Sequence, residues 1–367
     1  MTGNNCRADS IATTRRTALK SIGGFIPLSG AYLDLRDDSG GMTEIVTHMQ
    51  KDEVIKSREV PSDWLDNAIA AQAAVKETRH LKSEVTGVNS TYIAPTGEEI
   101  GGFRKYEIQV AVNPGVQSPD LPSQVQGIPV RMIREPSGVP TGCLNHGDGF
   151  DNMPGGVEMT TDITGGTAGC PATNNGDACM LTAAHLFEDC TRAINGDPGY
   201  QSDSIGDSNR EFGQVNDHYQ RHDWATIDFN NSNGITRDTT IQMPSQRVNV
   251  AGRVTQQGVL GLASSGDTIQ KISINTGHTT GQVIGMNGNG GFDCVSMDGD
   301  GVRISNDQAA GDSGSVCFDK EGNYAYIISV VSIGFSQKGT SCSATEYERG
   351  GGWPAYKLYQ NAGVSFP

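Results

Sequence analysis

Three short strings in this sequence supply the side chains that acyl transfer requires. A serine hydroxyl is a poor nucleophile at neutral pH, so it needs an adjacent base to take its proton and a third group to orient that base. His185 ends the string Thr-Ala-Ala-His, and Asp223 opens the string Asp-Trp-Ala-Thr-Ile. Ser313 lies in Gly-Asp-Ser-Gly, where the glycines let the backbone turn its amides toward a substrate oxygen. The strings predict a general base, an orienting carboxylate and a nucleophile.

The order of these residues narrows the class of enzyme. His185, Asp223 and Ser313 follow one another at separations of 38 residues (185 to 223) and 90 residues (223 to 313). The α/β-hydrolases instead run serine, acid, histidine and carry Gly-x-Ser-x-Gly, which fails here because Ser315 stands two positions after Ser313. From about 155 to 367 the chain resembles the chymotrypsin-like and trypsin-like serine peptidases.

The first implication of this resemblance concerns the turn around the serine. The backbone amides of Gly311 and Ser313 would form an oxyanion hole, which stabilises the transition state by several kcal/mol in such enzymes. Asp312 would be a buried carboxylate that pairs either with a new N-terminal amine or with another cation. No Ile-Val-Gly-Gly activation site is evident, although 155–157 would suit the start of the first strand.

The second implication concerns the substrate. Ser332 and Gly334, in the string Ser-Ile-Gly, resemble the family's segment whose backbone pairs with an extended substrate, which favours a polypeptide. Asp307 lies six positions before Ser313, where trypsin-like members hold the carboxylate that selects Lys or Arg. An ordinary polar turn also explains Asp307 and is the favoured interpretation. Ala309 replaces the family's usual cysteine four positions before the serine, so the pocket need not have the family's shape.

Charge and composition exclude several classes of partner. The formal net charge is -15 and the pI is about 4.8, so nucleic acid and anionic membranes would be repelled. An acidic surface of this kind also suits high salt, where screening weakens self-repulsion. The 48 glycines and 15 prolines, with 35% hydrophobic residues, indicate many turns and short elements.

The other residues able to bind metals or form crosslinks give weaker patterns. Eight cysteines lack the close paired spacing of a zinc site, so disulfides are expected, with Cys317 and Cys342 as one candidate bridge. His218 and His222 lack the glutamate of a zinc-peptidase motif, and the acidic turn at 298–301 lacks the closing glutamate of a calcium loop. We expect no metal ion and no organic cofactor.

The N-terminus carries features of an export signal. The string 14–20, Thr-Arg-Arg-Thr-Ala-Leu-Lys, precedes a modest apolar run at 21–33 that is too short and too rich in glycine to span a bilayer. This arrangement resembles a twin-arginine signal, so 1–40 is predicted to be a signal and spacer. With the acidic composition, it resembles an exported haloarchaeal protein. The predicted location is extracellular or at the cell surface, without stable membrane insertion.

An α+β region is predicted from 41 to 150. Apolar residues recur at helical spacing between 43 and 83, beginning with Ile45, Val46 and Met49. Pro61 interrupts the pattern, and a second helix is expected to begin at Ser62 or Asp63.

Two strand-like runs complete this N-terminal region. Residues 106–112 alternate apolar and polar side chains, and 128–133 form a second run in which Pro129 favours an edge strand. The loop-like stretch 113–127 separates them. This region of 41–150 would be a small prodomain or accessory region.

Beyond it, short apolar runs bounded by turn residues predict an all-β domain from 153 to 367. We expect two antiparallel Greek-key β-barrels, with the N-terminal α+β region before them. His185 and Asp223 would come from the first barrel and Ser313 from the second. The short apolar runs that predict these strands are 180–184, 225–229, 248–250, 272–274, 283–286 and 324–333.

The sequence thus predicts a secreted serine endopeptidase that hydrolyses peptide bonds through an acyl-enzyme. Two alternatives stay open. One is a catalytically silent binding or structural protein on the same fold, and the other is a hydrolase of small esters.

Overall fold

The computed structural model describes residues 41–135, 149–187, 192–201, 206–229, 233–292, 295–341 and 344–367. Between 336 and 346 it describes the backbone alone. The predicted export signal, 1–40, lies outside these residues. None of the described helices is long and apolar enough to cross a membrane.

The predicted mostly β architecture, with a small helical N-terminal region, is confirmed. A smaller sheet of eight strands holds the first part of the predicted peptidase domain, and all its pairings are antiparallel. Its strands follow the order β25-β10-β11-β14-β13-β12-β8-β9. They are β8 (Val157–Thr160), β9 (Gly165–Ala168), β10 (Cys170–Asn174), β11 (Asp177–Thr182), β12 (Pro198–Tyr200), β13 (Glu211–Tyr219), β14 (Trp224–Asp228) and β25 (Val364–Ser365).

A larger sheet of 17 strands differs from the expected second barrel, because the N-terminal strands are part of it. It also contains three parallel pairings, β7 with β15, β16 with β23, and β4 with β6. Its C-terminal strands are β7 (Asn152–Gly155), β15 (Thr236–Gln242), β16 (Arg247–Val254), β17 (Ile269–Ser273), β18 (Gly277–Gly281), β19 (Val283–Gly288), β20 (Gly301–Ile304), β21 (Gln308–Ala309), β22 (Val316–Glu321), β23 (Tyr324–Ser341) and β24 (Ala344–Pro354). Its N-terminal strands are β1 (Met42–Gln50), β2 (Glu53–Pro61), β3 (Val88–Ile100), β4 (Phe103–Val112), β5 (Gln124–Val125) and β6 (Ile128–Arg134).

The first predicted helix is wrong, and the second is confirmed. Residues 42–50 form strand β1, which pairs with β2 on one side and with β16 on the other. The spacing of Ile45, Val46 and Met49 fits a helix, but a run rich in β-branched residues packs well between two strands. Helix α2 (Ser62–Glu77) begins where Pro61 ends the strand. The other helices are α3 (Leu81–Glu84), α4 (Gln256–Ser265) and α5 (Ala355–Ala362).

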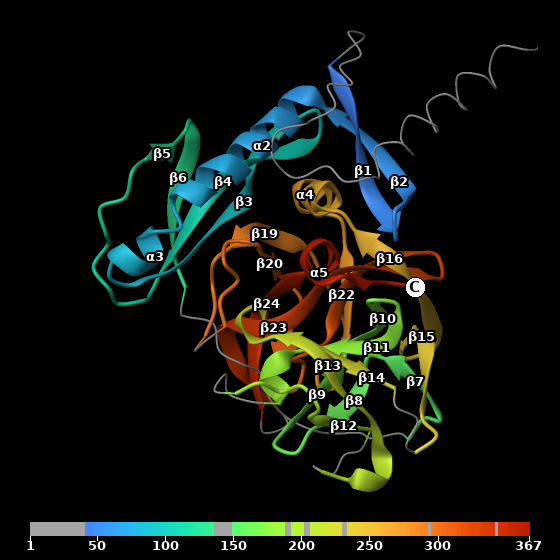
Figure 1. Cartoon of the computed structure of the whole chain (residues 1–367). Helices are drawn as coiled ribbons and strands as arrows, with labels where there is room; N and C mark the ends of the chain where they lie inside the picture. Colours follow the sequence, from blue (N-terminus) through green and yellow to red (C-terminus); the bar gives the residue numbers. More distant parts are fainter. Residues whose placement is uncertain are drawn as a thin grey trace, which may run out of the picture.

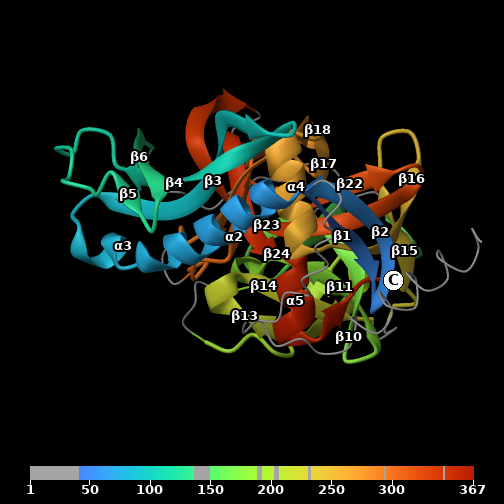
Figure 2. The ribbon, with the colours of Figure 1, turned by 90° about the horizontal axis from the view of Figure 1, so that it is seen from above.

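The N-terminal region and the C-terminal β-structure share one hydrophobic core. In Figures 1 and 2, α2 and the N-terminal strands lie beside α4, which belongs to the C-terminal part of the chain. Trp64 of α2 and Val259 of α4 are fully buried in this core. The Tyr106 hydroxyl donates a hydrogen bond to the Leu260 carbonyl at 2.6 Å. Residues 41–135 are therefore packed into the fold rather than tethered beside it.

Gly252 offers a test of this packing. Its φ is +142°, and an added Cβ would lie 2.2 Å from the Met49 carbonyl oxygen, where β16 meets β1. We expect Gly252→Ala to lower the free energy of unfolding by about 1–3 kcal/mol and to speed hydrogen exchange in β1. Urea denaturation and hydrogen exchange measure these effects. Gly97→Ala is the control, because nothing lies within 4 Å of its added Cβ, and equal stability of the two variants would contradict the packing.

Candidate active site

The smaller sheet brings His185 and Asp223 together. His185 lies in a short 3-10 turn, Ala184–Leu186, directly after β11, and Asp223 directly precedes β14. Strands β11 and β14 are neighbours, with Thr182 opposite Ala225, so the end of one meets the start of the other. Asp223 has φ 55° and ψ 53°, a left-handed conformation that aspartate adopts more readily than most residues.

Hydrogen bonds connect the predicted base, carboxylate and nucleophile in a chain. The Nδ1 atom of His185 lies 2.6 Å from Oδ2 of Asp223, and the backbone N–H of His185 donates to Oδ1 at 2.8 Å. The Nε2 atom of His185 lies 2.9 Å from the Ser313 hydroxyl oxygen. Since the carboxylate is an acceptor, Nδ1 carries the hydrogen and Nε2 presents a lone pair to the hydroxyl. This arrangement can take a proton from Ser313.

Asp217 and Asp228 are near Asp223 in sequence but have other partners. Asp217 accepts a hydrogen bond from the Asn174 side chain at 2.9 Å, and Asp228 accepts one from the Gln214 backbone at 3.0 Å. The carboxylate that meets the imidazole of His185 is that of Asp223, which is fully buried.

The turn that carries Ser313 is held between the two sheets. The Ser313 carbonyl accepts a hydrogen bond from the backbone N–H of Thr167 in β9 at 2.9 Å. The Gly314 N–H donates to the carbonyl of Val331 in β23, also at 2.9 Å. Gly314 has φ +86°, and an added Cβ would lie 2.2 Å from the Thr182 hydroxyl oxygen. Only glycine fits at this position, which explains its place in the Gly-Asp-Ser-Gly string.

The buried partner of Asp312 is a lysine. Lys271 of β17 lies with its Nζ 2.5 Å from Oδ2 of Asp312, and both side chains are fully buried. The same carboxylate accepts hydrogen bonds from the Thr276 hydroxyl at 2.7 Å and the Ala309 N–H at 2.9 Å. Burial alone would raise the pKa of Asp312, but the charge and hydrogen bond of Lys271, with the other donors, hold that pKa below its usual range.

Sequence reasoning left two kinds of partner open for Asp312 and did not find Lys271. The available signal was a lysine inside the apolar strand Ile269–Ser273, at a position that alternation places on the buried face. A lysine is almost never fully buried without a charged partner, so a buried lysine at this position implies an acidic partner elsewhere in the chain.

The predicted substrate-binding residues lie on β23, at the point where its pairing changes. The pairing of β22 with β23 reaches Val330, whereas from Ile333 to Phe335 the pairing within the described residues is with β24 alone. Ser332 is fully buried, and Gly334 pairs with Gly350. Within the described residues, Ile333 to Phe335 therefore pair with a strand on one edge only, and all three residues are buried.

Asp307 is exposed, whereas the next residue, Gln308, is fully buried. The Gln308 side-chain oxygen accepts a hydrogen bond from Lys271 Nζ at 3.2 Å, and its Nε2 donates to the Asn306 carbonyl at 3.2 Å. An added Cβ on Gly350 would lie 2.6 Å from Gln308 Nε2. In this loop the side chain of Gln308 lies inside the protein, whereas Asp307 is exposed to solvent.

The expected Cys317–Cys342 bridge is not formed, because Cys317 is a free buried thiol. Cys170 and Cys179 are also free and buried. Burial raises the pKa of the Cys179 and Cys317 thiols to about 12, and that of Cys170 well above its usual value. These thiols are small apolar side chains in the core. The other cysteines lie outside the described residues.

The acidic turn at 298–301, which resembles part of a calcium-binding loop in sequence, forms ion pairs with basic side chains. Asp298 accepts hydrogen bonds from Arg221 at 2.8 Å and from His222 at 2.9 Å. Asp300 lies 3.2 Å from the Lys357 ammonium. His222 also stacks on the Trp353 ring at a centroid distance of 3.5 Å. Arg221 and Lys357 therefore supply the positive charge that the two carboxylates pair with.

Several solved serine protease structures are similar to this chain. Nocardiopsis protease is 18% identical, with 59% of this chain and 100% of that chain covered and a TM-score of 0.42. A glutamic-acid-specific serine protease that uses a histidine triad in substrate binding is 21% identical, with 59% and 100% covered and a TM-score of 0.42. Cellulomonas bogoriensis chymotrypsin is 19% identical, with 59% and 98% covered and a TM-score of 0.42. No protein-family model matches the chain, and no curated protein matches its sequence.

Removing the ammonium from the buried ion pair tests its role. Lys271→Met leaves the Asp312 carboxylate buried without its counter-charge, so we expect the free energy of unfolding to fall by about 3–5 kcal/mol. A double variant, Lys271→Met with Asp312→Asn, should recover part of that loss. Urea denaturation at neutral pH measures both. Lys105→Met, which removes an exposed partner of Glu98, should change stability by less than about 0.5 kcal/mol. If Lys271→Met were as stable as wild type, this account would be contradicted.

The lowered pKa of Asp312 predicts a dependence on pH. The pKa of Asp312 is lower in the folded chain than in the unfolded chain. Its ionised form therefore stabilises the fold above about pH 4, and this stabilisation is lost as the pH falls through the folded-state pKa. We expect wild type to lose stability on acidification more steeply than Asp312→Asn does. Parallel slopes in urea denaturation between pH 6 and pH 2 would contradict the prediction.

Proposed function

We propose that this chain is a serine endopeptidase that acts through an acyl-enzyme. The observation that carries the proposal is the chain of short contacts from Asp223 through His185 to the Ser313 hydroxyl, at 2.6 Å and 2.9 Å. In the proposed reaction, Ser313 Oγ attacks the substrate carbonyl while His185 Nε2 takes its proton. His185 then gives this proton to the leaving amine, and water hydrolyses the ester in a second half-reaction. Asp223 holds the imidazole in the required tautomer.

The proposed oxyanion hole consists of the Gly311 and Ser313 amides. Two features support it. Gly311 has φ +98°, a conformation that favours glycine, and its carbonyl accepts a hydrogen bond from the Thr167 hydroxyl at 3.0 Å. The Lys271–Asp312 pair further fixes the turn from inside. Fixed donors of this kind need little reorganisation as negative charge develops on the substrate oxygen.

A polypeptide is the proposed substrate. The segment of β23 that contains Ser332 and Gly334 pairs with a strand on one edge only among the described residues, and in the proposed complex an extended peptide adds a strand at the other edge, beside the nucleophile. A small ester has no backbone with which to use such an edge. Asp307 stays a candidate for contacts with basic substrate residues at the exposed rim of the site.

Export is part of the proposal. The paired arginines at 15 and 16 support a twin-arginine route to the cell surface or the medium, and the net charge of -15 supports a high-salt environment such as that of haloarchaea. We propose that 41–150 is a prodomain or accessory region of the peptidase at 153–367.

Two observations favour the catalytically silent alternative. Ser313 has no exposed surface, and the His185 side chain is 12% exposed. Near the predicted substrate strand, the Arg303 guanidinium lies between Tyr92 of the N-terminal region and Phe335, at 4.1 Å and 4.2 Å from their rings. A protein that kept this form would not present Ser313 to a substrate, as the catalytically silent alternative requires.

Labelling with a fluorophosphonate probe separates these possibilities. We expect the full chain to be labelled once, at Ser313, and labelling to be lost in Ser313→Ala and His185→Ala. Asp223→Asn should lower kcat on a peptide substrate by about 10⁴-fold, because the imidazole then adopts the wrong tautomer. Ser83→Ala and His80→Ala are matched controls at exposed positions of the N-terminal region, and their labelling should equal that of wild type.

The pattern of activities decides among the three functions. Labelling together with cleavage of casein supports the endopeptidase. Labelling with ester hydrolysis but no peptide cleavage supports the small-ester hydrolase. A folded, full-length chain that is never labelled overturns the proposal and supports the binding protein.

A further inference from the structure

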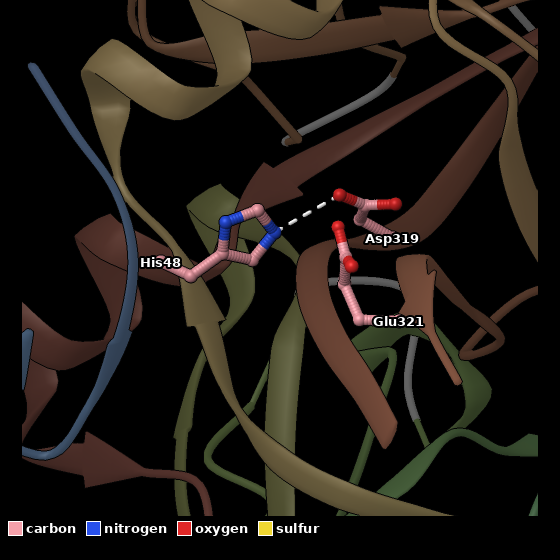
Figure 3. Close-up of side chains that lie close together, drawn as sticks. All are labelled: His48, Asp319 and Glu321. Carbon is pink, nitrogen blue, oxygen red and sulfur yellow. Dashed lines mark hydrogen bonds and ion pairs between the residues drawn. The ribbon is translucent and has the colours of Figure 1, made fainter. Parts of the chain in front are cut away.

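A histidine and two carboxylates meet where the N-terminal hairpin contacts the C-terminal β-structure, and Figure 3 shows this cluster. His48 extends from β1, and Asp319 and Glu321 extend from β22. One potential ligand atom from each residue lies within 4.8 Å of the other two. Asp319 and Glu321 are two positions apart on one strand, so their side chains leave the same face.

The hydrogen bonds of His48 indicate which ring nitrogen carries hydrogen. The Thr47 hydroxyl donates its hydrogen to the Lys56 carbonyl at 3.1 Å, so its oxygen is left to accept. That oxygen lies 2.9 Å from Nδ1 of His48, which therefore carries the hydrogen. In a neutral ring, Nε2 then presents a lone pair to the Asp319 oxygen 2.9 Å away. Two lone pairs repel at this distance, so a positive centre is needed between them.

The backbone and a neighbouring ring orient His48 toward the carboxylates. The register of β1 against β2 shifts on both sides of His48, and such bulges redirect a side chain. The Tyr326 ring meets the imidazole edge to face at a centroid distance of 4.7 Å. His48 is 2% exposed, so the ring is fixed inside the protein with Nε2 toward the two carboxylates.

We propose that His48, Asp319 and Glu321 bind one zinc ion, with water completing the coordination. One imidazole and two carboxylates are ligands that zinc accepts, and an Nδ1–H bonded to an oxygen is the usual support of a metal-binding imidazole. Calcium would need six to eight oxygen ligands. A proton between His48 and Asp319, with Glu321 paired to Lys56, is the competing arrangement, and zinc titration distinguishes the two.

Closing the site requires a small movement of exposed side chains. Zinc bonds of about 2.0–2.2 Å place tetrahedral ligand atoms roughly 3.3 Å apart. The three candidate ligand atoms now lie within 4.8 Å of one another, so the Glu321 side chain must rotate inward to bind the ion. Its side chain is 43% exposed, and its present partner Lys56 is 46% exposed. The Lys56 ammonium would move into solvent, which costs little because exposed ion pairs contribute little to stability.

A bound ion would tie the N-terminal hairpin to the strand that follows the candidate nucleophile. β22 begins at Val316, three positions after Ser313. Zinc would therefore stabilise the packing of β1 against the C-terminal β-structure whether or not the chain is an active peptidase.

Calorimetric titration of the chelator-treated, full-length chain with zinc chloride tests the site. We expect one zinc ion to bind, and affinity to fall by about 10-fold or more in His48→Gln, Asp319→Asn and Glu321→Gln. Cobalt(II) should give visible absorption bands in wild type that these variants lose. His278→Gln and Glu84→Gln, which change exposed residues outside the β1–β2 hairpin and β22, should bind as wild type does.

Thermal unfolding provides a second readout. Zinc should raise the Tm of wild type by more than that of Glu321→Gln, whose exposed side chain can be changed without disturbing the core. This variant keeps the test valid if His48→Gln does not fold. The proposal is overturned if wild type binds no zinc stoichiometrically, or if Glu321→Gln binds it with unchanged affinity. A proton would then join His48 to Asp319.

Discussion

The ion pair of Lys271 and Asp312 fixes the turn on which the candidate nucleophile lies. Both side chains are fully buried, so neither charge has water as an alternative partner. A buried ion pair gains little net stability over apolar packing, but loss of one partner leaves an uncompensated charge. The carboxylate also accepts the Ala309 N–H, which ties the ion pair directly to the backbone of the turn. The chain thus supplies the counter-charge of Asp312 from its own β17, without needing a new N-terminal amine.

The second constraint is the set of contacts between the two sheets. His185 and Asp223 belong to the smaller sheet, whereas the Ser313 turn belongs to the larger one. These three residues therefore meet only if the two sheets are held together at this place. Thr167 makes two of these contacts, through its N–H to the Ser313 carbonyl and through its hydroxyl to the Gly311 carbonyl. Glycine at 314 lets the turn approach Thr182 closely. The same turn contacts β23 through Val331, which places the candidate nucleophile beside the candidate peptide-binding strand.

The sequence carried enough information to predict the candidate triad and the mostly β architecture. The strings around His185 and Ser313 are local, and short apolar runs bounded by turn residues are typical of strands. Contacts between distant segments were not predictable in this way. Residues 42–50 fit a helix by spacing and became a strand because β2 and β16 flank them.

Other partners were equally hidden from sequence reasoning. Lys271 and Asp312 are 41 positions apart, and His48 and Asp319 are 271 apart. Nothing in the spacing of these residues reveals their pairing. The expectation of a bridge at Cys317 failed for a related reason, since a buried free thiol and a disulfide half look alike in sequence.

The most direct test of the account is a crystal structure of the full chain after reaction with a fluorophosphonate. We predict phosphorus bonded to Ser313 Oγ, with one phosphonyl oxygen about 2.7–3.1 Å from the Gly311 and Ser313 amide nitrogens. His185 should remain hydrogen-bonded to Asp223. An adduct on another residue, or a phosphonyl oxygen directed away from both amides, would contradict the proposed catalytic site.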